Sequence, residues 1–370
     1  MTITTSTDDV NELKSVLRDF LTATASSEHV RRTIETADGF DATLWGRMVN
    51  ELGLPGLAVP EDYGGGGYDA SVQLAVFEEL GRSLACVPYL STVGLAIPAL
   101  LACAASPVRS ELLHRLAAGE ITAAVAHTAT DGTPSGVTAK AENPDSDRAV
   151  LHGETSFVID GASADVVLVA AHDGAELQLY VVDASSAGVS RKPMRVLDQT
   201  RPMAHIVFNA TPARRISVGD AGAVLDVAVD EANAMIAAEQ LGGAARCLDM
   251  AVEYAKIRQQ FGRPIGSFQA VKHKCADMLV AVESARSAVD HLAAVLRYDP
   301  SALHTAAPLA KAFCSEAYTF VAGENIQVHG GIGFTWEHDA HLYFRRAHST
   351  AILHGDSAFQ RRTLADRLKF

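Results

Sequence analysis

Residues 327–334 read QVHGGIGF, and earlier in the chain residues 258–264 read RQQFGRP. Both segments follow a long stretch of helical periodicity and contain the glycine or proline that usually ends a helix. The glycines also permit positive φ and close approach of the backbone, so that their amide hydrogens can point at a phosphate group. A helix C-terminus would explain either segment alone, so the informative observation is that both occur in one chain.

The first of these segments carries side chains suited to an anionic ligand. The guanidinium of Arg258 can bind pyrophosphate oxygens through two parallel hydrogen bonds, and Phe261 supplies an aromatic face that can pack against a planar ring. Taken alone, residues 258–264 are still explained better by a helix C-terminus than by a cofactor-binding segment.

The composition is that of an ordinary soluble globular protein. The chain has 370 residues, of which 48% are hydrophobic and 20% charged, and this length allows two or three domains. The formal charge of −13 would repel nucleic acid and anionic lipid, and no Lys/Arg run interrupts it. We therefore exclude a role in nucleic-acid binding.

The cysteines indicate neither a disulfide framework nor a zinc site. They are five in number, widely spaced, and form no C-x-x-C pair. Reduced thiols in a cytoplasmic protein are the expected state. The five are Cys86, Cys103, Cys247, Cys275 and Cys314.

Residues 86–108 contain no charged side chain, which is long enough to suggest a membrane span. Pro88, Gly94 and Pro98 interrupt the stretch, and the first residues of the chain lack the basic segment of a signal peptide. We therefore expect a buried pair of helices and no membrane contact.

The order of elements indicates segregated layers. Residues 8–120 have helical patterns, for example at 11–22, residues 121–218 have short Val/Ile-rich runs typical of strands, and long helices return after residue 221. This order favours an α+β protein, mostly α, over an alternating βαβ fold. We predict an N-terminal helical domain (1–120), a central β-barrel or sandwich domain (121–218) and a C-terminal helical bundle domain (219–370). Because a helix precedes residues 330–333, they make a poor Rossmann fingerprint.

With this order of elements, the two segments resemble the flavin-holding signatures of the acyl-CoA dehydrogenase family, over nearly the whole chain from residue 52 (LGLPGLAVPEDYGG) through Phe359. The resemblance implies a C-terminal four-helix bundle, FAD as cofactor and α,β-desaturation of an acyl-CoA thioester. It also implies an electron-transfer flavoprotein as acceptor, a homotetramer or a heterotetramer with a homologous subunit, and a role in fatty acid or lipid metabolism. The residues it assigns to the FAD diphosphate and adenosine are Arg258, Gln260, Phe261, Gln269, Gln327, Gly330 and Gly331.

The β domain departs from the family pattern. Where family members read Trp-Ile-Thr-Asn-Gly beside the flavin, residues 157–161 read FVIDG, so Phe157 keeps an aromatic wall while Ile159 replaces the hydroxyl donor. The segment that usually reads Thr-Glu-Pro is TAT at residues 128–130, and Thr128 is still expected to meet the flavin.

The catalytic base also departs from the pattern. Abstraction of the α-proton of a thioester requires an aligned carboxylate whose pKa is raised by burial. The usual glutamate position corresponds to His354, and the position on the earlier helix that some members use corresponds to Ala232. Neither position carries a carboxylate.

Several explanations stay open. His354 can itself be the base, since imidazole has a suitable intrinsic pKa. Asp356 or Glu231 can take the role after a small backbone shift. The chain can instead be a catalytically silent subunit beside a base-bearing homologue, or a same-fold flavin oxidase or monooxygenase.

His338 and His341 are spaced to chelate a metal from one helical face. No third ligand is suggested, so we expect a solvated helix start and no metal.

Overall fold

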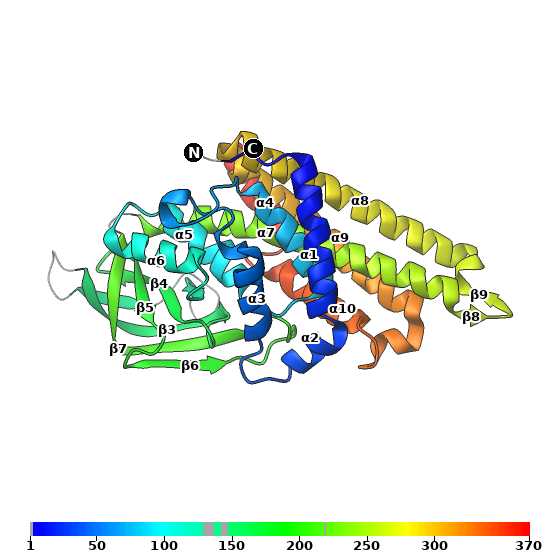
Figure 1. Cartoon of the computed structure of the whole chain (residues 1–370), viewed down its shortest axis with the longest axis horizontal. Helices are drawn as coiled ribbons and strands as arrows, with labels where there is room; N and C mark the ends of the chain where they lie inside the picture. Colours follow the sequence, from blue (N-terminus) through cyan, green and yellow to red (C-terminus); the bar gives the residue numbers. More distant parts are fainter. Residues whose placement is uncertain (1–2, 129–136, 142–146, 218–219) are drawn as a thin grey trace. The chain divides into compact units, whose positions relative to one another are not determined.

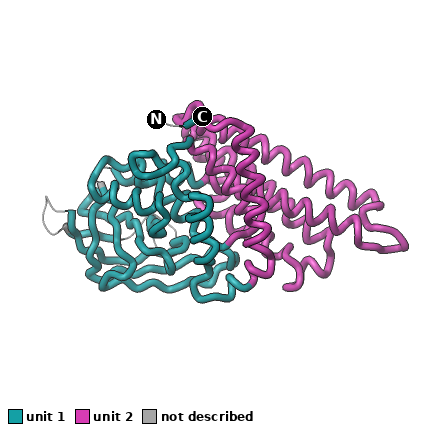
Figure 2. Tube along the Cα trace, viewed as in Figure 1, with its two compact units in different colours: residues 1–3, 32–68, 86–232 teal, residues 4–31, 69–85, 233–370 magenta. Residues whose placement is uncertain are grey.

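The chain folds into two units that each combine separate stretches of sequence (Figure 2). In this computed structural model, residues 3–128, 137–141, 147–217 and 220–370 are described. Unit 1 comprises residues 1–3, 32–68 and 86–232, and unit 2 comprises residues 4–31, 69–85 and 233–370. The domain boundaries at residues 120 and 218 stay predictions.

The helical character predicted for the first 120 residues is confirmed. Helix α1 begins with a capping box, in which the Ser6 hydroxyl accepts from the Asp9 amide while the Asp9 carboxylate accepts from the Ser6 amide at 3.0 Å. The elements of this region are α1 (Thr7–Thr24), α2 (Ser27–Thr33), α3 (Ala42–Leu52), η1 (Leu54–Gly56), η2 (Glu61–Tyr63), α4 (Ser71–Ser83), η3 (Leu90–Ala96), α5 (Ile97–Ala102) and α6 (Pro107–Ala117).

The uncharged stretch 86–108 forms buried helical turns, as predicted. Its polar side chains find partners within unit 1: the Ser91 hydroxyl donates to the Asp160 carboxylate at 2.7 Å, and the Thr92 hydroxyl donates to the Ala123 carbonyl at 3.2 Å. Over the described ranges, no helix is long and apolar enough to cross a membrane.

The predicted β domain is a seven-stranded sheet in unit 1 (Figure 1). Successive pairing joins β4, β2, β3, β7 and β5, and β5 pairs again with β4, so the sheet closes on itself. Apolar side chains such as Leu151, Tyr180 and Phe208 fill its core. The strands are β1 (Ala123–Ala126), β2 (Thr138–Ala141), β3 (Arg148–Ile159), β4 (Val166–Asp173), β5 (Glu176–Asp183), β6 (Val189–Pro193) and β7 (Met203–Ser217).

The long C-terminal helices are also confirmed, and α8 and α9 pack side by side (Figure 1). A buried ion pair joins two of these helices, because Arg346 of α10 lies 3.0 Å from the Glu239 carboxylate of α7. The elements are α7 (Ala221–Ile257), β8 (Gln259–Gln260), β9 (Arg263–Pro264), η4 (Ile265–Ser267), α8 (Gln269–Tyr298), η5 (Pro300–Ala302), α9 (Leu303–His329), η6 (Gly330–Phe334), α10 (Ala340–Ile352) and α11 (Ser357–Leu368).

Candidate active site

The segment after α7 forms a small hairpin that presents its side chains to solvent. Strands β8 and β9 pair antiparallel, with Gln260 opposite Arg263, and Phe261 and Gly262 form the turn at φ values of 52° and 75°. Phe261 is 91% exposed, and Arg258 and Gln260 are exposed as well. An exposed aromatic ring at a hairpin tip buries almost none of its apolar surface within the chain. It therefore remains available to pack on a ligand or a partner.

The end of α9 presents a second exposed set. Gly330 ends the helix at a φ of 63°, and a Cβ added at Gly330 or Gly331 would meet no atom within 4 Å. The Gln327 side chain is exposed one turn earlier. The open space beside the glycines allows a ligand to approach the backbone closely.

A ring stack ties these two segments together within unit 2. Tyr254, near the end of α7, stacks on His329, the last residue of α9, with centroids 4.3 Å apart. His329 Nδ1 donates to the Asn325 carbonyl at 2.8 Å, and burial lowers the pKa of the imidazole. Neither ring was predicted to contribute to the site, although each stands within four residues of a predicted contact.

Gln269, the first residue of α8, is the last of the seven residues assigned to the dinucleotide, and it too is exposed. All seven therefore face solvent in the single chain. Their groups suit a diphosphate and an adenosine, since they comprise one guanidinium, three carboxamides, an aromatic ring and two unhindered glycines.

In unit 1, the structure brings Thr128 next to the bulged part of β3. The Thr128 hydroxyl donates to the Ser156 carbonyl at 2.9 Å, and the Thr155 hydroxyl donates to the Thr128 carbonyl. Phe157 occupies the bulge at a φ of 59° and is 46% exposed, whereas Ile159 is buried. Ala129 and Thr130 lie outside the described residues.

The half-buried His354 lies between α10 and α11, in the left-handed region at a φ of 56°. Its carbonyl accepts a hydrogen bond from the Gln360 side chain at 2.7 Å. A Cβ at the next residue, Gly355, would approach the Phe359 ring to 2.2 Å, so only glycine fits there. The backbone around His354 is therefore tightly constrained.

The other candidate bases differ in their surroundings. The Asp356 carboxylate caps α11, since it accepts from the Phe359 amide at 2.8 Å. Ala232 is fully buried, and Glu231 beside it is half-buried, with burial raising the pKa of its carboxyl to about 7.

The expectation of a solvated helix start is wrong for His341. This ring is only 8% exposed and lies edge-on to Trp336 at 4.5 Å, and burial lowers its pKa to about 4. Neither ring nitrogen has a hydrogen-bond partner in the part of the chain that is described. Among those same residues, no cluster of three or more His, Cys, Asp or Glu side chains is placed to hold a metal ion.

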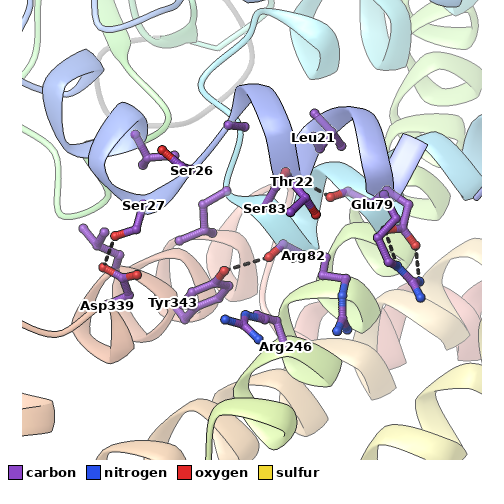
Figure 3. Close-up of a pocket in the computed structure, with 15 residues that line it drawn as sticks. Leu21, Thr22, Ser26, Ser27, Glu79, Arg82, Ser83, Arg246, Asp339 and Tyr343 are labelled. Carbon is purple, nitrogen blue, oxygen red and sulfur yellow. Dashed lines mark hydrogen bonds and ion pairs between the residues drawn. The ribbon is translucent and has the colours of Figure 1, made fainter. Parts of the chain in front are cut away.

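A cavity of about 400 Å³ opens in unit 2 between α1, α2, α4, α7 and α10 (Figure 3). Three arginines line it, and each is engaged by a carboxylate: Arg18 with Glu79 at 2.5 Å, Arg82 with Asp249, and Arg246 with Glu253 at 3.7 Å. None of the predicted site residues is in its lining. With its cations already paired, this cavity is a weaker candidate site than the exposed segments.

Comparison with known proteins shows the family of this chain. Residues 7–120 match the acyl-CoA dehydrogenase N-terminal domain, and residues 223–369 match the acyl-CoA dehydrogenase C-terminal domain. The chain therefore belongs to the acyl-CoA dehydrogenase family, whose reaction is the α,β-desaturation of acyl-CoA thioesters.

Three relatives illustrate the similarity. The acyl-CoA dehydrogenase IpdE2 of Mycolicibacterium smegmatis is 38% identical, with 96% of this chain and 98% of that protein covered. Among solved structures, the ChsE4–ChsE5 complex from Mycobacterium tuberculosis has a TM-score of 0.88 at 30% identity, covering 99% of this chain and 98% of the matched chain. A variant of the Tcur3481–Tcur3483 steroid ACAD has a TM-score of 0.87 at 28% identity, covering 98% of each.

Proposed function

We propose that this protein binds FAD at the exposed segments and desaturates an acyl-CoA thioester. The observation that carries the proposal is the joining of residues 258–261 and 327–331 by the Tyr254–His329 stack. Arg258 would bind the diphosphate, Phe261 would pack on a ring of the cofactor, and the unhindered Gly330 and Gly331 would let it approach the backbone.

The exposure of all seven residues supports an oligomeric site. A cofactor held only by exposed groups of one chain would keep much of its own surface in water, so a second subunit is needed to cover it. We assign this cover to another subunit of the tetramer. Thr128, Phe157 and Ile159 of the β domain are assigned to the flavin end.

Within one chain, we take His354 as the base because the family resemblance aligns it with the usual glutamate, and Glu231, whose pKa burial raises to about 7, is the alternative. The Asp356 carboxylate already serves as a helix cap, whereas the His354 side chain caps no helix and its backbone is held by Gln360. His354 would remove the α-proton of the thioester. Bound FAD would accept the hydride that leaves the β-carbon, and an electron-transfer flavoprotein would then accept the electrons.

A second candidate function is that of a silent subunit in a hetero-oligomer. The resemblance aligns His354 and Ala232 with the family glutamates, and neither is a carboxylate. Two similar solved structures, ChsE4–ChsE5 and Tcur3481–Tcur3483, also contain two differently named chains. In this case a homologous chain would supply the base, and this chain would complete the FAD site.

The deciding experiment is anaerobic mixing of the purified, FAD-loaded homo-oligomer with acyl-CoA thioesters. The panel should contain straight-chain acyl groups and steroid-derived acyl groups, because one of the similar structures is a steroid ACAD. Bleaching of the oxidised flavin would show that the chain contains its own base. Bleaching only after co-expression with a homologous subunit would support the silent-subunit function, and a preparation that binds no FAD in either form would overturn the proposal.

A further inference from the structure

A buried lysine lies behind the His354 segment. Lys311 of α9 is completely excluded from solvent, and burial lowers the pKa of its ammonium to about 8. Among the described residues, no carboxylate lies within ion-pair distance of it. Its contacts are the Ser315 hydroxyl at 3.0 Å and the Ala351 carbonyl at 3.3 Å. A buried cation without a carboxylate partner is costly, so its surroundings must compensate in another way.

Two features compensate: the Asp356 carboxylate, whose charge raises the pKa of the ammonium from beyond ion-pair distance, and the end of helix α10. The last turn of α10 contains no basic residue, so the negative end of its dipole has no cation from its own sequence. Lys311 supplies that charge from the neighbouring helix, through the Ala351 carbonyl. The ammonium and the helix end therefore stabilise each other.

A polar network holds the same turn from a second side. The Gln240 carboxamide of α7 donates to the Thr350 hydroxyl at 3.1 Å and to the Ser315 hydroxyl at 3.0 Å. Ser315 also accepts from Lys311, so these four buried side chains form one connected group. Removal of any member would leave the others short of a partner in a dry environment.

The constrained turn leads directly into His354. Only Ile352 and Leu353 stand between Ala351 and His354, and the His354 carbonyl accepts a hydrogen bond from Gln360. The Ser357 hydroxyl donates to the Ala312 carbonyl at 3.1 Å, beside Lys311 in α9. Helix α9 therefore contacts the chain on both sides of His354, and Lys311 makes a direct hydrogen bond on the α10 side.

We infer that Lys311 is a positioning residue for His354. Its ammonium fixes the end of α10, and through it the left-handed backbone from which the imidazole projects. This assignment rests on the proposed function, in which His354 acts on the α-proton. Lys311 does not touch the substrate.

The test compares Lys311→Met with Lys311→Gln. Methionine keeps the length of the side chain and removes the charge and the donors, whereas glutamine restores a neutral donor. An exposed lysine of β6, in Lys192→Met, is the control. We expect the limiting rate of flavin reduction to fall about tenfold or more in Lys311→Met and less in Lys311→Gln, with the half-saturating acyl-CoA concentration unchanged.

Hydrogen–deuterium exchange supplies a readout that needs no turnover. Amides of residues 351–356 should exchange faster in Lys311→Met than in the wild type and in Lys192→Met. If Lys311→Met does not fold, the same two measurements are made on Lys311→Gln. A variant with wild-type limiting rate and wild-type exchange at 351–356 would overturn the inference. A wild type that never reduces its flavin contradicts His354 as base, and faster exchange would then still show that Lys311 positions the segment.

Discussion

The ring of Tyr254 stacks on the ring of His329 at 4.3 Å, and this contact joins the ends of helices α7 and α9. The residues proposed to hold FAD come from the segments that follow each ring. Because His329 is also anchored to the Asn325 carbonyl, it offers a fixed surface on which the α7 end can rest.

Loss of this stack should weaken cofactor binding without removing any proposed contact. In His329→Leu we expect a loss of about 1 kcal/mol in FAD affinity, the range measured for aromatic pairs. The check is a fluorescence titration of apoprotein with FAD. A matched control is His348→Leu, which removes a histidine packed at 4.3 Å on Phe344. Equal losses in both variants would show that the effect is not specific to the stack.

Arg258→Ala should give largely colourless protein. The substitution removes the only guanidinium assigned to the diphosphate, and charge-assisted hydrogen bonds are among the stronger polar contacts. The flavin-to-protein absorbance ratio of the purified variant measures the effect. Arg47→Ala, which removes another exposed arginine, serves as the control. An unchanged ratio in Arg258→Ala would remove Arg258 from the proposed site.

Substitutions of His354 and Asp356 should have different effects. His354→Ala should retain flavin but no longer bleach with acyl-CoA, because the proposed base is absent. Asp356→Ala should lose about 1 kcal/mol of stability through the missing cap of α11 and still bleach. Thermal melts and anaerobic flavin reduction on both variants make the test. Bleaching by His354→Ala at the wild-type rate would transfer the base to Glu231 or to another chain.

Glu231 should make stability depend on pH. Burial raises the pKa of its carboxyl from 4.5 to about 7, so the folded protein holds this proton between those values while the unfolded chain has lost it. The stability contributed by the protonated carboxyl is complete below pH 4.5 and is lost as the pH rises through 7.

The comparison protein is Glu231→Gln, which stays neutral at every pH. Relative to the wild type, this variant should gain about 1–3 kcal/mol between pH 4.5 and pH 8. Melting curves of both proteins in matched buffers give the difference. A difference that does not vary with pH would mean that the carboxyl is solvated in the assembled protein.

Much of the fold was readable because it depends on local pattern. The helical periodicity of residues 11–22 and the Val/Ile-rich runs of the middle region predicted elements that the structure confirms, since hydrophobic spacing and turn residues act over short distances. Arg258 and Gly330 could likewise be identified as motif residues from the sequence.

By itself, the sequence determined the order of helices and strands and the family, and it predicted a substitution at the usual glutamate positions. The tertiary structure alone decided which side chains share an environment. In the folded chain Tyr254 stacks on His329, and His341 is buried where a solvated ring was expected. The Lys311 ammonium contacts the end of α10. Burial and contact between distant segments depend on how helices pack, and a helical position carries no signal of what the neighbouring helix will present to it.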